Sequence, residues 1–200
     1  VDELRNLLKE NPDLCGLNVT IPYKEKVIKL LTDIDPAAKR IGAVNVIKIK
    51  DGKLKGFNTD SDAFRETLER WFPNPSGSKA LILGTGGSSK AVQEALKKLE
   101  IPFETVSREK GNGDYIYSDL EKNGKIVAGV NLVINTTPLG MSPNTNEVPP
   151  IDYEQITPNH FVYDLIYNPA RSMFLQIAEM RGAVVRNGLE MLHIQAEKAW

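Results

Sequence analysis

Lys24 and Asp60 are candidates for a catalytic acid–base pair. Pro22 suits the first turn of a helix, so we expect Lys24 to lie near the amino end of that helix. A cation is disfavoured at this end of a helix, and burial disfavours it further. Under these conditions an amine can exchange protons near neutral pH. The alternative is a surface lysine beside Glu25 and Lys26.

Asp60 lies where a helix is predicted to begin, next to Asn58, Thr59 and Asp62. It could be the helix N-cap, which would give it a purely structural role. Alternatively, Thr59 and Asp62 form a capping box and leave the Asp60 carboxylate free. A free carboxylate beside a catalytic lysine would hold a substrate hydroxyl and stabilise the charged amine.

A glycine-rich loop lies between a predicted strand and a predicted helix. Glycine permits a tight turn and a close approach to pyrophosphate, while the helix contributes free N–H groups. Ser89 occupies the position of the third glycine in the usual G-x-G-x-x-G pattern. The alternative is an ordinary glycine turn. The candidate cofactor-binding residues of this loop are Gly84, Thr85, Gly86, Gly87 and Ser88.

The end of the next predicted strand bears on the choice of cofactor. NAD enzymes usually place an acidic residue there, whereas an arginine accommodates the 2′-phosphate of NADP. Here Ser107 and Arg108 follow the strand, while Glu104 falls in its middle. We therefore predict NADP, with Arg108 on the 2′-phosphate, Ser107 as a neighbouring donor and Lys110 adding charge. The alternative is a solvated basic loop.

A further loop, NTTPLGM at residues 135–141, follows a third strand of this region. Loops at the carboxyl ends of parallel strands line the ligand crevice in dinucleotide-binding folds, so Thr136 is another cofactor-binding candidate. The alternative is a simple Pro-Gly turn.

The predicted elements fall into two groups. In the first group, strands are predicted at residues 17–21, 43–49 and 54–57, with a hairpin turn at Asp51-Gly52 and a helix from about residue 61. After a turn cluster at residues 73–77, short apolar strands alternate with helical stretches, which is typical of a parallel sheet covered by helices. These strands are predicted at residues 79–83, 103–107, 132–135, 161–164 and 184–185.

This order predicts an α/β fold with a Rossmann-type parallel-sheet nucleotide domain and a smaller α/β substrate domain. Residues 1–62 are expected to form the substrate-binding and catalytic domain, and residues 63–188 the NADP-binding domain. Residues 189–200 are expected to form a helix that returns to the first domain. Because the sequence opens on Val1 within a helical pattern, we expect it to be a fragment that lacks the N-terminal part of the smaller domain.

Composition excludes several classes of function. A net charge of −1 provides no field that would attract nucleic acid or an anionic membrane. No apolar run is long enough to cross a bilayer, and no signal peptide is visible. Cys15 is the only cysteine, so a cysteine metal cluster is not expected and no metal ligand is predicted. We expect a cytoplasmic monomer or homodimer that binds small molecules.

Taken together, these segments resemble the shikimate dehydrogenase family. The resemblance runs from Asn18 to the C-terminus, and its markers occur in family order. They are NVTIPYK at 18–24, IGAVN at 41–45, NTD at 58–60, GTGGS at 84–88, NTTPLGM at 135–141, YDLIYNP at 163–169 and NGLEML at 187–192.

The resemblance implies a role for each matching residue. Lys24 and Asp60 match the catalytic pair, and the glycine loop and Arg108 match the cofactor site. Leu165 and Gly188 match positions that we place beside the cofactor's nicotinamide. The predicted substrate-binding residues are Thr20, Asn45, Tyr167 and Gln195.

The implied reaction is the NADPH-dependent, reversible reduction of 3-dehydroshikimate to shikimate in aromatic amino-acid biosynthesis. Two alternatives are an NAD-dependent quinate/shikimate dehydrogenase and a non-catalytic dinucleotide-binding sensor. Retention of both Lys24 and Asp60 argues against the sensor.

The sequence also departs from the family pattern. Tyr23 stands where the family often has His, Val46 where it often has Thr, and Ser107-Arg108-Glu109 where it has Asn-Arg-Thr. The family's N-terminal strand and the Ser-x-Ser motif that binds the substrate carboxylate have no counterpart in this sequence. We attribute this last departure to truncation and expect weak substrate binding by the chain as given.

Overall fold

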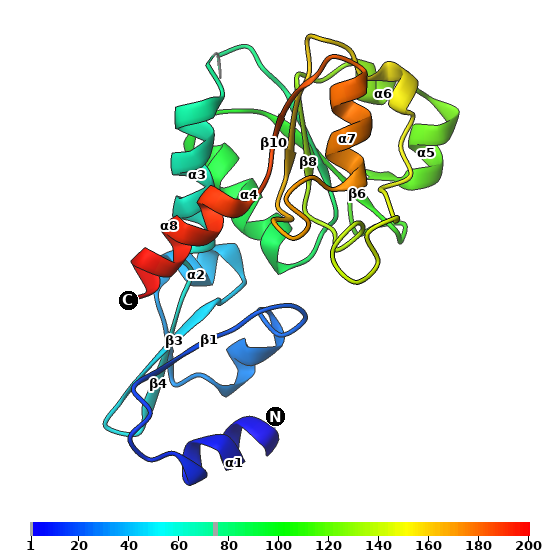
Figure 1. Cartoon of the computed structure of the whole chain (residues 1–200). Helices are drawn as coiled ribbons and strands as arrows, with labels where there is room; N and C mark the ends of the chain where they lie inside the picture. Colours follow the sequence, from blue (N-terminus) through cyan, green and yellow to red (C-terminus); the bar gives the residue numbers. More distant parts are fainter. Residues whose placement is uncertain (1, 74–75) are drawn as a thin grey trace.

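The computed structural model describes residues 2–73 and 76–200, and within these ranges the strands form two separate sheets (Figure 1). The turn predicted at residues 73–77 includes Asn74 and Pro75, which lie outside the described residues. The predicted α/β fold is confirmed, because a parallel Rossmann-type sheet is joined to a smaller mixed sheet. None of the helices in the described ranges combines the length and the apolar character that a membrane span needs.

The smaller sheet is built around a hairpin. Its part of the chain contains α1 (Asp2–Glu10), β1 (Gly16–Asn18), the 3₁₀ helix η1 (Lys26–Leu30), β2 (Asp33–Ile34), α2 (Pro36–Ile41), β3 (Val46–Lys50) and β4 (Lys53–Phe57). Asp51 (φ 50°) and Gly52 (φ 71°) connect β3 to β4, and both adopt the positive φ that a favoured two-residue hairpin turn requires. The strand order is β1-β3-β4-β2, with only the β2–β4 pair parallel.

The larger sheet is parallel throughout. Its strands are β5 (Ala80–Leu83), β6 (Phe103–Ser107), β7 (Tyr115–Ile116), β8 (Leu132–Asn135), β9 (Phe161–Asp164) and β10 (Val184–Arg186). In the order β10-β9-β8-β5-β6-β7, the strand order reverses between β5 and β8, because β6 and β7 are added on one side of β5 and β8 to β10 on the other. In open parallel sheets, a crevice for ligands forms at the carboxyl ends of the strands at such a switch point.

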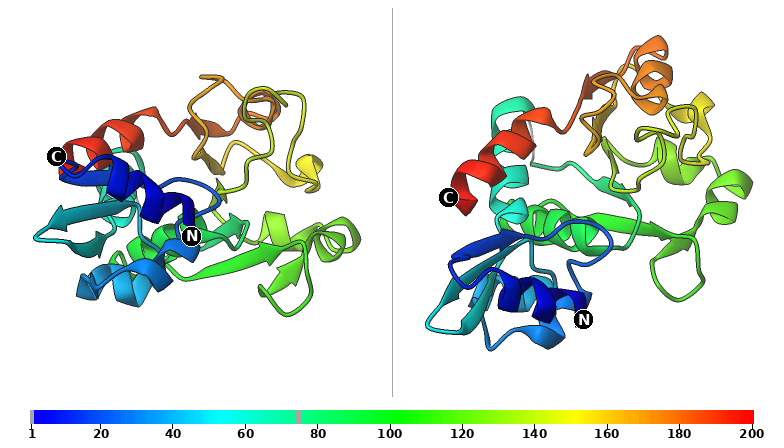
Figure 2. Two further views of the ribbon diagram at one scale, coloured as in Figure 1. Left: turned by 90° about the horizontal axis from the view of Figure 1, so that it is seen from below. Right: turned by 60° about the horizontal axis from the view of Figure 1, so that its bottom comes forward.

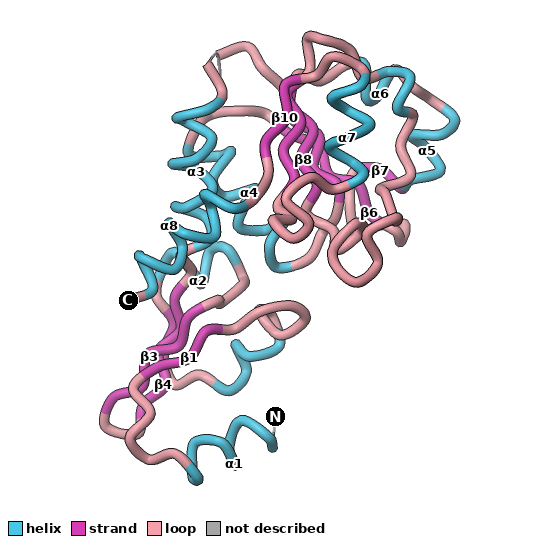
Figure 3. Tube along the Cα trace, in the orientation of Figure 1, coloured by secondary structure: helices cyan, strands magenta, loops and turns pink. Residues whose placement is uncertain are grey.

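Helices cover both faces of the parallel sheet (Figure 3). They are α3 (Asp60–Trp71), α4 (Gly87–Lys98), α5 (Tyr117–Lys122), α6 (Lys125–Ala128), the 3₁₀ helix η2 (Tyr153–Gln155), α7 (Met173–Met180) and α8 (Leu189–Ala199). Successive strand residues point to opposite faces. Ile82 and Ile134 therefore pack in the core with α3, α4 and α8, whereas Leu81 and Val133 pack in the core with α5, α6 and α7.

The last helix connects the two parts of the molecule. In both views of Figure 2, the red helix α8 lies beside the teal helix α3, next to the smaller sheet. The hydroxyl of Thr59, just before α3, donates a hydrogen bond of 3.0 Å to the backbone carbonyl of Gln195 in α8. The C-terminal segment thus reaches the site region after the parallel sheet is complete.

The helix predicted to follow Pro22 is wrong. Residues 20–23 form a turn closed by the Tyr23 N–H and the Thr20 carbonyl, and only η1 follows it. The Lys24 carbonyl accepts a 2.8 Å hydrogen bond from the Val44 N–H, so the Ile28 N–H bonds to Glu25 instead. Lys24 therefore lies in a loop tied to the sheet rather than in the first turn of a helix.

Candidate active site

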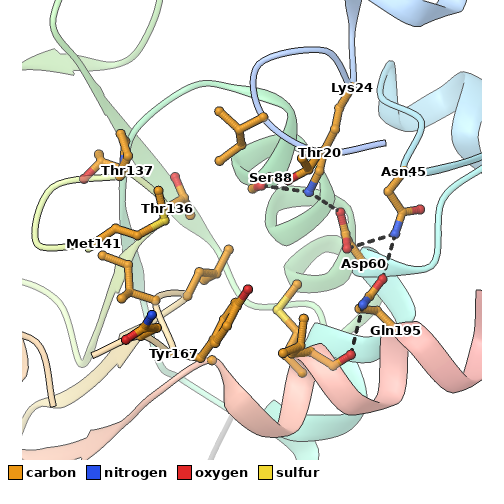
Figure 4. Close-up of a pocket in the computed structure, with 18 of the residues that line it drawn as sticks. Thr20, Lys24, Asn45, Asp60, Ser88, Thr136, Thr137, Met141, Tyr167 and Gln195 are labelled. Carbon is orange, nitrogen blue, oxygen red and sulfur yellow. Dashed lines mark hydrogen bonds and ion pairs between the residues drawn. The ribbon is translucent and has the colours of Figure 1, made fainter. Parts of the chain in front are cut away.

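Lys24 and Asp60 form an ion pair between two separate parts of the chain (Figure 4). The Lys24 Nζ lies 2.8 Å from Asp60 Oδ2, and the two side chains are 13% and 6% exposed. Lys24 comes from the loop before η1, and Asp60 is the first residue of α3. The structure thus brings together the two residues that the sequence proposes for acid–base chemistry.

The Lys24 side chain is held against the glycine-rich loop. A β-carbon at Gly87 would lie 3.0 Å from the Lys24 Cβ and 3.4 Å from the Ala43 Cβ. A side chain at position 87 would therefore push against the lysine stem. Gly87 allows Lys24 to cross close to the start of α4 and to extend its amine toward Asp60.

Asp60 is free for the site because other groups serve the amino end of α3. The Asn58 side-chain oxygen accepts a 3.1 Å hydrogen bond from the Ser61 N–H. The capping box predicted for Thr59 and Asp62 is wrong, because the Thr59 side chain makes no capping hydrogen bond. Its hydroxyl instead donates a hydrogen bond to the Gln195 carbonyl and accepts one from the Asn45 amide. The Asp60 carboxylate is left to bind side chains of the site.

Asn45 joins the acid–base pair to the C-terminal helix. Its amide nitrogen donates to Asp60 Oδ1 at 3.0 Å and lies 3.3 Å from Gln195 Oε1. Its side-chain oxygen accepts from the Thr59 N–H at 2.8 Å. Asn45 is buried, so the loop before β3, the start of α3 and helix α8 share one polar network.

This network forms one wall of a cavity of about 430 Å³. Tyr167 and Met141 lie on the side opposite Lys24 and Asp60 (Figure 4). Tyr167 is 45% exposed, which places it at the rim. All the predicted substrate-binding residues line this cavity, together with Thr136, Leu165 and Gly188 from the predicted cofactor set.

A second cavity of about 550 Å³ adjoins the first at Lys24, Ser88 and Thr136, which line both. The glycine-rich loop at residues 84–88 lines it, as do Ser107 and Arg108 at the end of β6. The two cavities meet beside the acid–base pair. A dinucleotide in the second cavity would thus reach a small molecule in the first.

Three glycines shape this region in different ways. Gly84 has φ 108°, and a β-carbon there would lie 2.7 Å from the Thr136 hydroxyl. A β-carbon at Gly86 would meet nothing within 4 Å, so the space beside it is open to a ligand. A β-carbon at Gly188 would lie 2.1 Å from the Leu165 carbonyl oxygen, so that position requires glycine.

Ser89 accounts for the incomplete glycine pattern. Its hydroxyl donates a 2.7 Å hydrogen bond to the Gly84 carbonyl, and the residue is buried. The serine closes the loop with a side-chain hydrogen bond at the position where the usual pattern has glycine. The geometry of the loop therefore fits a dinucleotide despite the departure.

The predicted phosphate site contains a free arginine. Arg108 is exposed, and it forms no ion pair within the described residues. The neighbouring Glu109 accepts a 2.9 Å hydrogen bond from Asn112, while Glu104 pairs with Lys79 at 2.8 Å, away from the cavity. Lys110 does not line the cavity. Of the two basic residues that follow β6, Arg108 therefore lines the second cavity and Lys110 does not.

Two residues that bear on the cavities are not among the predicted site residues. Tyr117 lines the second cavity, and its buried hydroxyl has no hydrogen-bond partner among the described residues. Asp164 is fully buried and accepts hydrogen bonds from Asn135 and the Ser172 hydroxyl. Burial raises the pKa of Asp164 to about 6, although these hydrogen bonds oppose the shift. This network holds together the loops after β8 and β9, which wall the first cavity.

Comparison with known proteins identifies the family. The family described as "Shikimate dehydrogenase substrate binding domain" matches residues 2–47. A shikimate dehydrogenase (NADP(+)) of Desulforamulus reducens is 38% identical over 205 residues, covering 94% of this chain and 70% of the relative. This chain belongs to the shikimate dehydrogenase family. A second member, from Clostridium botulinum, is 40% identical over 99% of this chain and 78% of its own length.

Solved structures of the shikimate dehydrogenase family share this fold. The enzyme of Thermus thermophilus, solved with NADP(H) and shikimate, matches with a TM-score of 0.84 and 31% identity. The match covers 100% of this chain and 77% of that protein. A quinate dehydrogenase of Corynebacterium glutamicum, solved with NAD, matches with a TM-score of 0.83 and 27% identity over 98% of this chain and 75% of that one.

Proposed function

We propose that this chain catalyses the reversible, NADP-dependent interconversion of shikimate and 3-dehydroshikimate. The observation that carries the proposal is the Lys24–Asp60 ion pair at the junction of the two cavities. Family membership supports the same reaction, since the curated relatives are NADP-dependent shikimate dehydrogenases.

In the direction of reduction, the Lys24 ammonium donates a proton to the oxygen that develops negative charge on the substrate. Asp60 holds the ammonium by its 2.8 Å contact and orients the reacting hydroxyl. General acid assistance of this kind contributes about 10²–10⁴-fold to the rate. In the direction of oxidation, the same amine accepts the proton. The substrate's other hydroxyls are bound by Thr20, Asn45 and Gln195, with Tyr167 at the rim.

The residues of the second cavity suit NADP. When bound, the nicotinamide cofactor supplies the hydride in reduction and accepts it in oxidation. The open space at Gly86 and the N–H groups at the start of α4 would hold the pyrophosphate. Arg108 would bind the 2′-phosphate with Ser107 beside it. Leu165 and Gly188, which line the adjoining first cavity, would flank the nicotinamide.

An ultraviolet assay of reduced nicotinamide tests the proposal. Purified protein is mixed with shikimate or quinate, each with NADP or NAD. We expect the highest kcat/KM for shikimate with NADP. A preference for NAD with quinate would favour the alternative quinate/shikimate dehydrogenase. Tight NADP binding without turnover of either substrate would favour a dinucleotide sensor and contradict the proposal.

The predicted domain assignment and oligomeric state remain predictions. Helix α3 spans the proposed boundary after residue 62, and its apolar side chains pack in the core of the parallel sheet. A monomer or a homodimer is expected. Light scattering after size-exclusion chromatography distinguishes the two.

A further inference from the structure

The Ser88 side chain contacts Lys24, although Ser88 itself belongs to the glycine-rich loop. It is the second residue of α4, and its hydroxyl accepts a 3.2 Å hydrogen bond from the Lys24 amine. Figure 4 shows the amine of Lys24 between Ser88 on one side and Asp60 on the other. The lysine amine thus has one acceptor on the nucleotide loop and one at the start of α3.

The number of acceptors matters for proton transfer. A lysine ammonium has three N–H bonds, whereas the neutral amine has two N–H bonds and a lone pair. Asp60 and Ser88 provide two acceptors, which leaves the third position of the nitrogen for a ligand at the junction of the two cavities that Lys24 lines. That position carries an N–H in the ammonium and the lone pair in the amine. Both protonation states can then meet a substrate oxygen without rotation of the amine.

We propose that Ser88 is a positioning residue that fixes the orientation of the Lys24 amine for proton transfer. The inference rests on the proposed function, and it assigns the Ser88 side chain to the lysine rather than to the cofactor phosphates. The backbone of Ser88 remains part of the nucleotide loop. The hydrogen bond therefore connects the cofactor site directly to the acid–base pair.

The neighbouring serine provides a contrast. The Ser89 hydroxyl donates to the Gly84 carbonyl at 2.7 Å, and Ser89 lines neither cavity. Ser89 has a structural hydrogen bond within the loop, whereas Ser88 bonds to a residue 64 positions earlier in the chain. Two adjacent hydroxyls of the same helix turn can thus be removed separately to compare the two roles.

Ser88→Ala is the main test, with steady-state kinetics of shikimate oxidation by NADP. A net hydrogen bond of ordinary strength predicts a kcat about three- to tenfold lower. The KM values for both substrates and the Kd for NADPH should stay within about twofold. The solvent deuterium isotope effect on kcat should rise, because proton transfer becomes more rate-limiting. Ser88→Thr, which keeps the hydroxyl, should restore most of kcat.

Ser89→Ala serves as the matched control. It should lower the melting temperature without raising the solvent isotope effect. An unchanged kcat in Ser88→Ala would overturn the inference, as would a weaker NADPH Kd with kcat unaffected, which would assign the hydroxyl to the cofactor. Absence of turnover in the unmutated protein would instead contradict the proposed function itself, so the two failures are distinguishable.

Discussion

Gly188 and Leu165 approach so closely that a β-carbon at Gly188 would lie 2.1 Å from the Leu165 carbonyl oxygen. Gly188 has φ −81°, so glycine is required here by space and not by a left-handed backbone. The contact joins the loop after β9 to the amino end of α8, and both residues line the first cavity. The wall of this cavity therefore depends on the lack of a side chain at position 188.

The first prediction is that Gly188→Ala destabilises the protein. The obstacle is a backbone carbonyl, which cannot rotate away as a flexible side chain can. Overpacking of this kind costs about 3 kcal/mol, at the upper end of its usual range. The melting temperature should fall by roughly 6–12 °C in a scanning calorimetry experiment. A melting temperature equal to that of the unmutated protein would show that the two loops are not held at this separation.

Gly86→Ala should weaken cofactor binding without lowering the stability of the fold. A β-carbon there meets nothing within 4 Å and the backbone φ of −78° suits alanine, so the fold should keep its melting temperature. The added methyl group would occupy the open space proposed for the pyrophosphate. NADPH affinity, measured by fluorescence titration, should fall about tenfold or more, as loss of charge-assisted hydrogen bonds predicts. Unchanged affinity would place the pyrophosphate elsewhere.

Arg108→Ala should discriminate between cofactors. The arginine has no ion-pair partner within the described residues and faces the second cavity. Its loss should weaken NADPH about tenfold or more, because a hydrogen bond to a charged group contributes about 1.5–3 kcal/mol. NADH, which lacks the 2′-phosphate, should lose little. Lys110→Ala is the control, since Lys110 does not line the cavity. Equal losses for NADPH and NADH would refute the assignment.

Ionisation of Asp164 should lower the free energy of unfolding as pH rises. Burial raises the pKa of Asp164 from its ordinary value of 3.8 to about 6. Between these values the folded state holds a proton that the unfolded state has lost, so the free energy of unfolding falls as pH rises through this window. The decrease amounts to at most about 3 kcal/mol.

Asp164→Asn tests this pH dependence. An amide can keep the acceptor for Asn135 and Ile166 and can donate to the Ser172 hydroxyl. Urea unfolding at several pH values should show the variant gaining stability relative to the unmutated protein between about pH 4 and about pH 6. Parallel curves for the two proteins over that range would mean that Asp164 ionises normally in the folded state.

Apolar patterning predicts the parallel sheet well. The expected strands at residues 103–107, 132–135 and 161–164 coincide with β6, β8 and β9. β8 (LVIN) and β9 (FVYD) are buried at nearly every position, and their sequences are apolar up to the last residue of each strand. The two-residue strands β2 and β7 are not predicted, because two residues show no periodicity.

Local signals fail where a tertiary hydrogen bond decides the backbone. Pro22 favours a helix start. In the structure, however, the Lys24 carbonyl accepts a hydrogen bond from the Val44 N–H, and a 3₁₀ helix follows. Similarly, spacing cannot choose among Asn58, Thr59 and Asp60 as the cap of α3, since all three are adjacent. Contacts from Asn45 and α8 decide the outcome.

The residues of the predicted site come from segments that are far apart in the chain, so their geometry depends on tertiary packing. The sequence places Ser88 in the cofactor loop, but its contact with Lys24 spans 64 positions and leaves no local pattern. The same holds for Gln195, whose approach to Asn45 follows only from the return of α8. The family resemblance supplied Gln195, which would otherwise be read as an exposed helix residue, whereas Ser88 was predicted with the glycine-rich loop.

The most direct test of the account is the turnover of Lys24→Ala with shikimate and NADP, followed by ultraviolet absorbance. Lys26→Ala is the matched control, because Lys26 lies two residues away and lines neither cavity. We predict that Lys24→Ala lowers kcat by about 10²–10⁴-fold while NADPH binding stays nearly intact, and that Lys26→Ala retains full turnover. A Lys24→Ala protein with the turnover of the unmutated enzyme would contradict the acid–base role of Lys24.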